Sequence, residues 1–339
     1  MGKYVMAIDQ GTTGTRIMIV NRSGEIVSKA YSEFPQIYPK PGWVEHDPEV
    51  IWETTVSVMS KALQSSSINP SDIRAIGITN QRETTVLWEK NTLKPVHNAI
   101  VWQCRRSAGI CDDLKNSGYA GLFQEKTGLL IDAYFSGTKV KWLLDTVPGL
   151  KDRAKSGEIA FGTIDTWLIA KLSKGRIHAT DYTNASRTLL FNIHDKIWDN
   201  ELLDILDIPK EMLPEVFDSA QIIGHTDPDI LGCEIPIAGI AGDQQAALFG
   251  QGCFYEGQAK NTYGTGCFLL LNVGDKKVTP KSGLILTLAC DENGRPCYAL
   301  EGSIFIAGAV VQWLRDGLGL IENASQTEEI ATSVDDSHG

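Results

Sequence analysis

The sequence predicts an α/β fold with two domains, and three observations support this prediction. The chain opens on an apolar run, residues 4–8, followed by a loop rich in Gly and Thr and by a second apolar run. Segments typical of strands and helices then alternate along the chain. A second pair of apolar runs surrounds Gly264-Thr265-Gly266 much later. With 339 residues, 42% of them hydrophobic, the chain is long enough to bury the cores of two domains.

The first loop, residues 9–16, has the composition of a phosphate-binding turn. It holds two Gly and three Thr around one Asp and one Arg. Gly lets backbone N–H groups approach a phosphate closely, and Thr adds hydroxyl donors. Asp9 follows a strand, where its carboxylate can hold a metal ion through water. The loop is equipped for Mg-ATP, although it is no Walker loop. The alternative is an ordinary hairpin turn rich in Thr and Gly.

The other elements follow from apolar periodicity and from turn residues. A three-stranded meander is expected first, and then a helix from Asp47-Pro48 to about Ser65, because Asp is a good N-cap and Pro fits the first turn. We place the domain boundary near residue 250, giving domains 1–250 and 251–339. The expected strands are 3–9, 15–21, 25–34, 73–79, 84–88, 98–102, 235–241, 258–263 and 267–273, and further helices are expected at 105–116 and 303–317.

Charge and cysteine usage exclude several classes of protein. The 31 basic and 42 acidic residues give a net charge of −11, which makes general nucleic-acid binding unfavourable. The seven Cys form no C-x-x-C pair, which indicates free thiols in a reducing compartment. The first apolar run is broken by Asp9, so no signal peptide is expected, and the apolar stretch 304–314 is too short to span a bilayer. A soluble, cytoplasmic protein without membrane insertion is therefore expected.

Asp243 is a candidate general base. It follows an apolar strand and precedes a helical pattern, which projects it into the crevice where ligands bind in open α/β sheets. Phosphoryl transfer from ATP to an alcohol needs a group that accepts the hydroxyl proton. The alternative is a helix N-cap, because Asp before Gln-Gln-Ala-Ala-Leu caps well, and the two roles can coexist.

Arg82-Glu83 is an adjacent pair of opposite charges just after a strand. The simplest interpretation is a surface ion pair. A polyol site, however, needs a cationic donor beside an anionic acceptor, because each hydroxyl both donates and accepts hydrogen bonds. By themselves, Trp102 and Phe268 would be interpreted as core aromatics.

Long stretches of the chain carry a resemblance to a known family. They are Asp9-Gln10-Gly11-Thr12-Thr13 and residues 38–48, 77–85, 99–106, 181–188, 239–250 and 261–268. Over essentially its whole length the chain resembles the glycerol kinases, within the carbohydrate kinases that share the actin and hexokinase ATPase fold. The resemblance implies two actin-like (ribonuclease H-like) domains with mixed sheets flanked by helices. Because family members continue past Gly339, it also implies that the second domain is incomplete here and lacks the adenine pocket.

The resemblance also implies a reaction and its residues. The reaction is ATP-dependent phosphorylation of glycerol to sn-glycerol 3-phosphate with Mg²⁺, in a homo-oligomer that is a dimer or tetramer. Asp243 would be the general base, and Asp9 and Asp243 would lie on the metal side. Glycerol would contact Arg82, Glu83, Trp102, Tyr134, Asp243, Gln244 and Phe268. The nucleotide would contact Thr12, Thr13, Arg16, Gly264, Thr265, Gly266, Gly308 and Gln312.

Two other functions remain open at this point. One is a kinase for another polyol or a ketose, although Arg82-Glu83 with Trp102 favours glycerol. The other is a non-catalytic, actin-like nucleotide-binding protein. Retention of Asp243 beside a pair suited to a polyol argues against it, since a scaffold needs only the phosphate loops.

Overall fold

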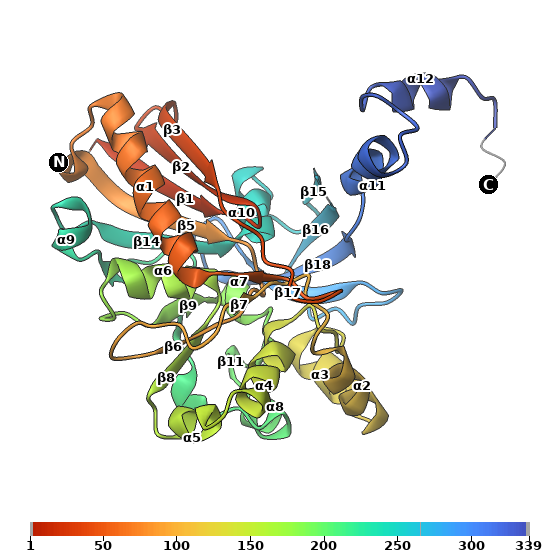
Figure 1. Ribbon diagram of the computed structural model, residues 1–339, viewed down its shortest axis with the longest axis horizontal. Helices are drawn as coiled ribbons and strands as arrows, with labels where there is room; N and C mark the ends of the chain where they lie inside the picture. Colours follow the sequence, from red (N-terminus) through yellow and green to blue (C-terminus); the bar gives the residue numbers. More distant parts are fainter. Residues whose placement is uncertain (1–2, 265, 337–339) are drawn as a thin grey trace.

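A six-stranded mixed sheet forms the centre of the first part of the chain, in a computed structural model that describes residues 3–264 and 266–336 (Figure 1). In spatial order its strands are β13 (Gly224–His225), β14 (Pro236–Gly242), β5 (Ile73–Asn80), β1 (Tyr4–Gln10), β2 (Gly14–Asn21) and β3 (Ile26–Glu33). β1, β2 and β3 form the expected antiparallel meander. β5 lies parallel to β1, and β14 lies parallel to β5. These three strands therefore end at the same edge of the sheet.

Two helices, α1 (Pro48–Ser66) and α6 (Ile164–Leu172), pack on this sheet (Figure 1). α1 begins as predicted, because the Asp47 side chain accepts a hydrogen bond of 2.9 Å from the backbone N–H of Glu49. Alternate residues of β1 and β2, among them Met6, Ile8, Ile17 and Ile19, are buried beneath the helices, which is the period expected of a sheet with one covered face. The shared core includes Met6, Ile8, Ile17, Ile19, Ile51, Met59, Trp167 and Leu168.

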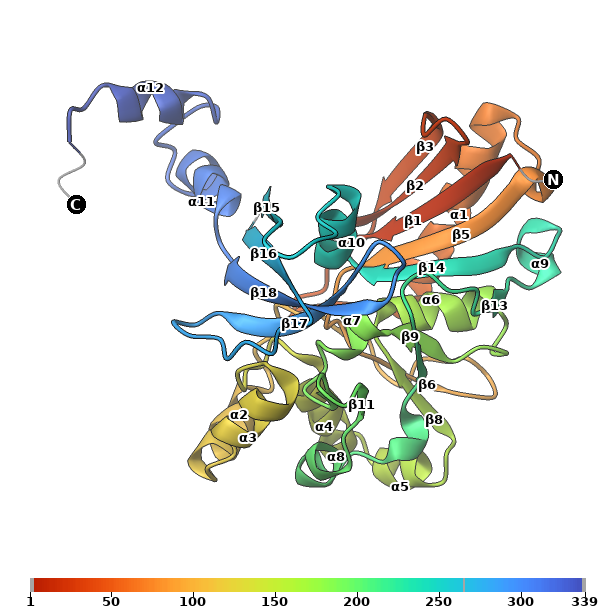
Figure 2. The ribbon, with the colours of Figure 1, turned by 180° about the vertical axis from the view of Figure 1, so that it is seen from behind.

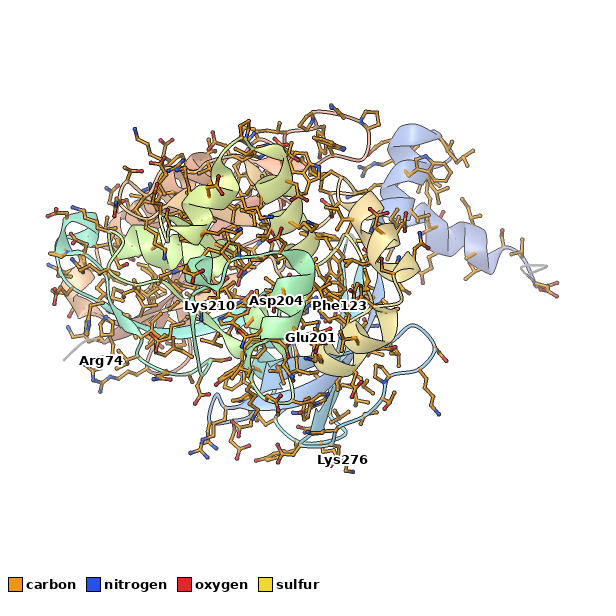
Figure 3. The ribbon with its side chains drawn as sticks, turned by 90° about the horizontal axis from the view of Figure 1, so that it is seen from below. Arg74, Phe123, Glu201, Asp204, Lys210 and Lys276 are labelled. Atoms are coloured by element: carbon orange, nitrogen blue, oxygen red, sulfur yellow. The ribbon has the colours of Figure 1, made fainter. Side chains whose placement is uncertain are left out.

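The segment between β5 and β14 adds a mostly helical layer around a second core, in which Phe123 (labelled in Figure 3) is fully buried. Three elements predicted here are shorter or shifted. The strand 84–88 is β6 (Val86–Glu89), the strand 98–102 is β7 (Ala99–Ile100), and the helix 105–116 is α2 (Ala108–Asn116). The remaining elements are β4 (Glu45–His46), α3 (Ala120–Thr127), α4 (Ser136–Thr146), α5 (Leu150–Lys155), β8 (Ile159–Gly162), β9 (Ala179–Asp181), α7 (Tyr182–Ala185), β10 (Phe191–Asn192), β11 (Ile197–Trp198), α8 (Asn200–Leu206), β12 (Glu215–Phe217) and α9 (Pro228–Leu231), with 3₁₀ turns Pro70–Asp72 and Lys210–Met212.

A second, antiparallel sheet follows α10 (Asp243–Gly250). Its strands lie in the order β15 (Ala259–Tyr263), β16 (Cys267–Gly274), β18 (Pro296–Ile304) and β17 (Ile285–Cys290) (Figure 2). This sheet is seated against the first part of the chain. The N–H of Leu286 donates to the carbonyl of Gly128 at 2.9 Å, and a small apolar core lies between the two parts. Residues of both parts can therefore meet in one site.

The segment 303–317 differs from the prediction of one buried helix. Residues 303 and 304 continue β18, where Ser303 pairs with Phe268, and the helix α11 (Gly308–Gln312) begins only later. A π-helical turn (Trp313–Gly317) and α12 (Gln326–Thr332) follow, and this end of the chain projects from the body (Figures 1 and 3). α11 holds no buried residue, and the side chain of Trp313 is 55% exposed. Among the described residues, no helix is long and apolar enough to cross a membrane.

Candidate active site

A cavity of about 190 Å³ lies where β5 and β14 end, opposite the hairpin of β15 and β16. It collects residues from six separate parts of the chain. It is lined by Thr12, Gln81, Arg82, Glu83, Trp102, Tyr134, Asp243, Gln244, Thr262, Gly264, Gly266 and Phe268. The structure thus brings together all seven residues proposed for the polyol and three of those proposed for the nucleotide.

Strand register explains why residues distant in sequence converge here. Gly242, the last residue of β14, lies beside Asn80, the last residue of β5. The residues that follow, Asp243 on one strand and Arg82 on the other, therefore leave the sheet at the same edge. Gly242 is also sterically required, because a Cβ there would lie 2.7 Å from Cδ of Arg82. The approach of these two segments fixes the distance between their charged side chains.

Asp243 is the first residue of α10 rather than its N-cap, which is Gly242. Its Oδ1 accepts from the backbone N–H of Gln244 at 2.8 Å, and its Oδ2 accepts from Nε2 of Gln244 at 3.1 Å. Nε of Arg82 lies 3.4 Å from Oδ1. The side chain remains 39% exposed at the cavity, so a ligand can reach the carboxylate.

Arg82 and Glu83 are no surface ion pair, since their side chains are only 2% and 1% exposed. Nη1 and Nη2 of Arg82 donate to the two carboxylate oxygens of Glu301 on β18, at 2.6 and 3.0 Å. Nε of Arg187 donates to Oε1 of Glu83 at 2.6 Å. Buried charges are stable only when paired and hydrogen-bonded, and here two arginines balance two glutamates.

Sequence reasoning missed four buried residues of this site, of which Arg187, Gln245 and Glu301 contact Arg82 or Glu83. Burial raises the pKa of Glu301, but Arg187 and Arg82 outweigh it, so the pKa lies below its ordinary value. The fourth, Lys260, donates to Oε1 of Gln244 and, at 2.9 Å, to Oγ1 of Thr262. Arg187 lies inside the stretch 181–188 that carries the family resemblance, and this resemblance could have identified it. Glu301 and Lys260 are single charged residues within strands, so the sequence alone did not indicate their role.

Aromatic rings form the wall of the cavity. Trp102 lies edge-on to Tyr134 and to Phe268, with ring centroids 5.7 and 6.4 Å apart. The indole N–H of Trp102 donates to Oγ1 of Thr12 at 2.9 Å. Trp102 therefore connects the wall of the cavity with the loop of residues 9–16, a contact that its interpretation as a core aromatic did not include.

The first loop contributes Thr12 to the cavity, and the turn between β15 and β16 contributes Gly264 and Gly266. A Cβ at Gly266 would lie 2.6 Å from the carbonyl oxygen of Ile304, so this turn admits no side chain there. The N–H of Gly308 donates to the carbonyl of Gly264 at 3.0 Å, which fixes α11 to the turn. Gln312 is exposed farther along α11 and does not line the cavity. Thr265, the middle residue of the turn, lies outside the described residues.

Asp9 and Asp243 offer oxygen donors for a cation. Burial raises the pKa of Asp9, Arg16 opposes this rise, and the charge of Asp243 reinforces it. Arg16 lies 3.5 Å from Oδ2 of Asp9 at the side of the hairpin, and neither it nor Thr13 lines the cavity. Two carboxylates that repel each other suit Mg²⁺, which takes its remaining ligands from water and phosphate. The two carboxylates thus fit a magnesium ion.

Buried His46 is linked to the loop of residues 9–16 through the side chains of Gln36 and Gln81. Its Nε2 donates to Oε1 of Gln36 at 2.6 Å, and its Nδ1 accepts from Gln81 at 3.4 Å. Gln36 in turn donates to the carbonyl of Thr12 at 3.0 Å, and Gln81 donates to that of Gly11 at 3.0 Å. His46 must be neutral to accept at Nδ1, and burial lowers its pKa to about 4.

Acidification is expected to destabilise the fold through His46. Between pH 6.5 and 4 the unfolded chain binds a proton that the folded chain does not, so the free energy of unfolding falls as the pH falls. The full loss is about 3 kcal/mol for this group. Urea unfolding at pH 7 and pH 5 should show a smaller loss for His46→Gln than for the parent. The substitution His225→Gln, at an exposed position, provides the matched control. An equal pH dependence of the free energy of unfolding in His46→Gln and in the parent would contradict the assignment.

Two family descriptions match the chain. The N-terminal domain of the FGGY family of carbohydrate kinases matches residues 4–250, and its C-terminal domain matches residues 259–337. Glycerol kinase 2 of Thermotoga maritima is 61% identical over 337 residues, which are 99% of this chain and 68% of the relative. The glycerol kinase of Caldanaerobacter subterraneus subsp. tengcongensis is 61% identical over the whole chain, again covering 68% of the relative.

Solved structures agree with this similarity. The crystal structure of Plasmodium falciparum glycerol kinase with ADP matches with a TM-score of 0.90 at 38% identity, over 98% of this chain and 67% of that one. A xylulose kinase from Lactobacillus acidophilus, at 24% identity, has the same fold with a TM-score of 0.86, over 98% of this chain and 66% of that one. The fold is therefore the actin-like ATPase fold, as expected, and the chain belongs to the FGGY family of carbohydrate kinases.

Proposed function

We propose that this protein phosphorylates glycerol at the expense of ATP and forms sn-glycerol 3-phosphate. The observation that carries the proposal is a single cavity in which Asp243 and the Arg82-Glu83 pair are brought together with Thr12 and with the turn of Gly264 and Gly266. The 61% identity with glycerol kinases over the whole chain supports the choice of glycerol among the substrates of the family.

In the proposed reaction, Asp243 accepts the proton of one glycerol hydroxyl as that oxygen bonds to the γ-phosphorus of ATP. The bond between this phosphorus and the bridging oxygen breaks, and ADP leaves. Asp9 and Asp243 would hold Mg²⁺, which when bound would stabilise the negative charge of the phosphates. Positioning and electrostatics supply most of the catalysis in such transfers.

The remaining residues have proposed binding roles. The hydroxyls of glycerol are contacted by Arg82, Glu83, Tyr134 and Gln244. Its carbon atoms are covered by Trp102 and Phe268. Domains 1–250 and 251–339 approach each other over the substrates and exclude water, which limits wasteful hydrolysis of ATP. The phosphates and nucleotide are held by Thr12, Thr13, Arg16, Gly264, Thr265, Gly266, Gly308 and Gln312.

A panel of polyols and sugars tests the substrate. ADP formation is measured with glycerol, erythritol, xylulose and gluconate. Because the paired charges leave unmatched polar groups when a hydroxyl is misplaced, glycerol should exceed each rival in kcat/KM by about 10²-fold or more. A ketose used as well as glycerol would favour another kinase of the family. ATP binding without phosphorylation of any alcohol would favour a nucleotide-binding protein without catalysis.

We further propose that the protein forms a homo-oligomer, either a dimer or a tetramer. Support comes from the exposed apolar side chains near α11, which include Ile306, Val310 and Trp313. Large exposed apolar patches usually mark interaction surfaces. Light scattering coupled to gel filtration measures the mass directly, and a monomer at micromolar concentration would exclude this state.

We also propose that the protein works in the cytoplasm. All seven cysteines are free thiols, most of them buried, as expected in a reducing compartment. Cell fractionation, followed by detection of the protein in the fraction that carries a known cytoplasmic marker, tests this location. Recovery with membranes or in the medium would contradict it.

A further inference from the structure

Glu301 connects the second sheet to the proposed polyol site. It lies on β18, it is fully buried, and its two carboxylate oxygens accept from Nη1 and Nη2 of Arg82 at 2.6 and 3.0 Å. Ser303 on the same strand donates to Oε1 of Glu301 at 2.9 Å. A two-bond contact of this kind fixes the plane of the guanidinium as well as its position.

The other contacts of Arg82 show which donor remains for a ligand. Nη1 also donates to Oε1 of Gln245 at 3.1 Å, and Nη2 donates to the hydroxyl of Tyr134 at 3.4 Å. Nε lies 3.4 Å from Oδ1 of Asp243, which is itself partly exposed at the cavity. Glu301 and Gln245 thus hold one side of the guanidinium and leave the Nε side toward Asp243.

Arg187 bridges the two glutamates, with one hydrogen bond to each. Its Nε donates to Oε1 of Glu83 at 2.6 Å, and its Nη2 donates to Oε1 of Glu301 at 3.0 Å. Within the described residues, Oε2 of Glu83 accepts no hydrogen bond, so this oxygen remains for a hydroxyl. The two arginines and two glutamates form a neutral, buried cluster, which we call the four-charge cluster: Arg82, Glu83, Arg187 and Glu301.

We propose that Glu301 is a positioning residue for polyol recognition, which acts by holding the Arg82 guanidinium with its Nε toward the cavity. This inference rests on the proposed function, because it assigns how the polyol side of that site is built. Without the carboxylate of Glu301, and among the described residues, Nη1 retains only Oε1 of Gln245 at 3.1 Å and Nη2 retains only the hydroxyl of Tyr134 at 3.4 Å, so the plane of the guanidinium is no longer fixed. Because Glu301 belongs to the second sheet, polyol affinity then depends on that sheet being seated on the first domain.

Glycerol binding without nucleotide, measured by calorimetry, tests the proposal with Glu301→Gln. The loss of a charged hydrogen-bond partner should raise the Kd of glycerol by about 10- to 100-fold. The KM for ATP and the kcat at saturating glycerol should change by less than about 3-fold. Glu256→Gln, which alters an exposed carboxylate of the same domain, is the matched control and should leave both ligands unaffected.

A double-mutant cycle separates positioning from general loosening of the fold. In an Arg82→Met background, Glu301→Gln should raise the Kd of glycerol by no more than about 2-fold, because nothing remains to be positioned. An equal effect in the parent and in the Arg82→Met background would overturn the proposal. If Glu301→Gln does not fold, Glu301→Asp keeps the charge but withdraws it by one methylene. It should still raise the Kd, and an unchanged Kd would overturn the proposal.

Glycerol binding by the parent protein distinguishes a failure of the positioning role from a failure of the proposed function. If the parent binds glycerol and Glu301→Gln binds it equally well, only the positioning role fails. If the parent binds neither glycerol nor any other polyol of the panel, the proposed function fails, and the positioning role fails with it.

Discussion

Asp243→Asn is expected to lower kcat by about 10²- to 10⁴-fold and to leave glycerol affinity nearly unchanged. The amide has the shape of the carboxylate, so it keeps the hydrogen bond from the N–H of Gln244 to Oδ1. It cannot accept the hydroxyl proton, however, and a group that takes this proton only in the transition state contributes to kcat without contributing to binding. Steady-state kinetics and calorimetry with glycerol measure the two quantities separately.

A matched control shows whether the effect belongs to this position. Asp229→Asn removes a charge from an exposed residue, whose partner is Lys174 on the surface, and should leave kcat unchanged. Turnover of Asp243→Asn within a factor of about three of the parent would rule out the general base. Another carboxylate or water would then have to accept the proton.

Arg82→Ala is expected to weaken glycerol binding far more than ATP binding and also to destabilise the fold. Loss of a charged partner to a buried hydroxyl costs about 1.5–3 kcal/mol of binding free energy. In addition, Glu301 loses its two-bond partner while both it and Glu83 remain buried. Breaking a buried ion pair typically lowers the free energy of unfolding by about 3–5 kcal/mol. Calorimetry with each ligand and urea unfolding measure the two effects.

Arg16→Ala provides the comparison for Arg82→Ala. Arg16 is half exposed on the first hairpin and lies 3.5 Å from Asp9. Its removal should therefore weaken the binding of ATP and leave both glycerol binding and the free energy of unfolding unchanged. The two variants should therefore show opposite ligand preferences. Equal weakening of glycerol and ATP by Arg82→Ala would mean that Arg82 does not recognise the polyol.

The first domain is predictable because its local signals agree with its packing. β1 and β2 are apolar runs that bury alternate residues, and α1 begins at an Asp-Pro pair that caps it as expected. Register between parallel strands then places Arg82 and Asp243 at one edge. Family motifs identify both residues, and elementary chemistry explains why an alcohol phosphotransferase needs them.

The segment 303–317 was mispredicted because pairing between strands overrides the local pattern. Its apolar run suits a helix, but Ser303 and Ile304 extend β18 against Phe268 and Cys267 of β16. Strand preference depends on such neighbours more than on the segment itself. The rest of the run does turn helical, yet α11 buries none of its residues within the described chain. Apolar composition alone therefore indicated burial that the structure does not show.

The four-charge cluster was beyond prediction from sequence. Arg82 and Glu301 are 219 positions apart, and their contact depends on how the second sheet is seated on the first domain. A single Glu in a strand is usually solvent-exposed, so its residue type gives no sign of burial. Only the three-dimensional pairing of the charges shows that Glu301 contacts Arg82 beside the cavity.

Phosphorus NMR of the reaction mixture tests the central claim most directly. The protein is incubated with Mg-ATP and glycerol, and the phosphorus signals are followed with time. We expect a signal of glycerol 3-phosphate that grows in equal amount with ADP, and its absence with Asp243→Asn. Formation of ADP and free phosphate without glycerol 3-phosphate, or the same product at the same rate with Asp243→Asn, would contradict the account.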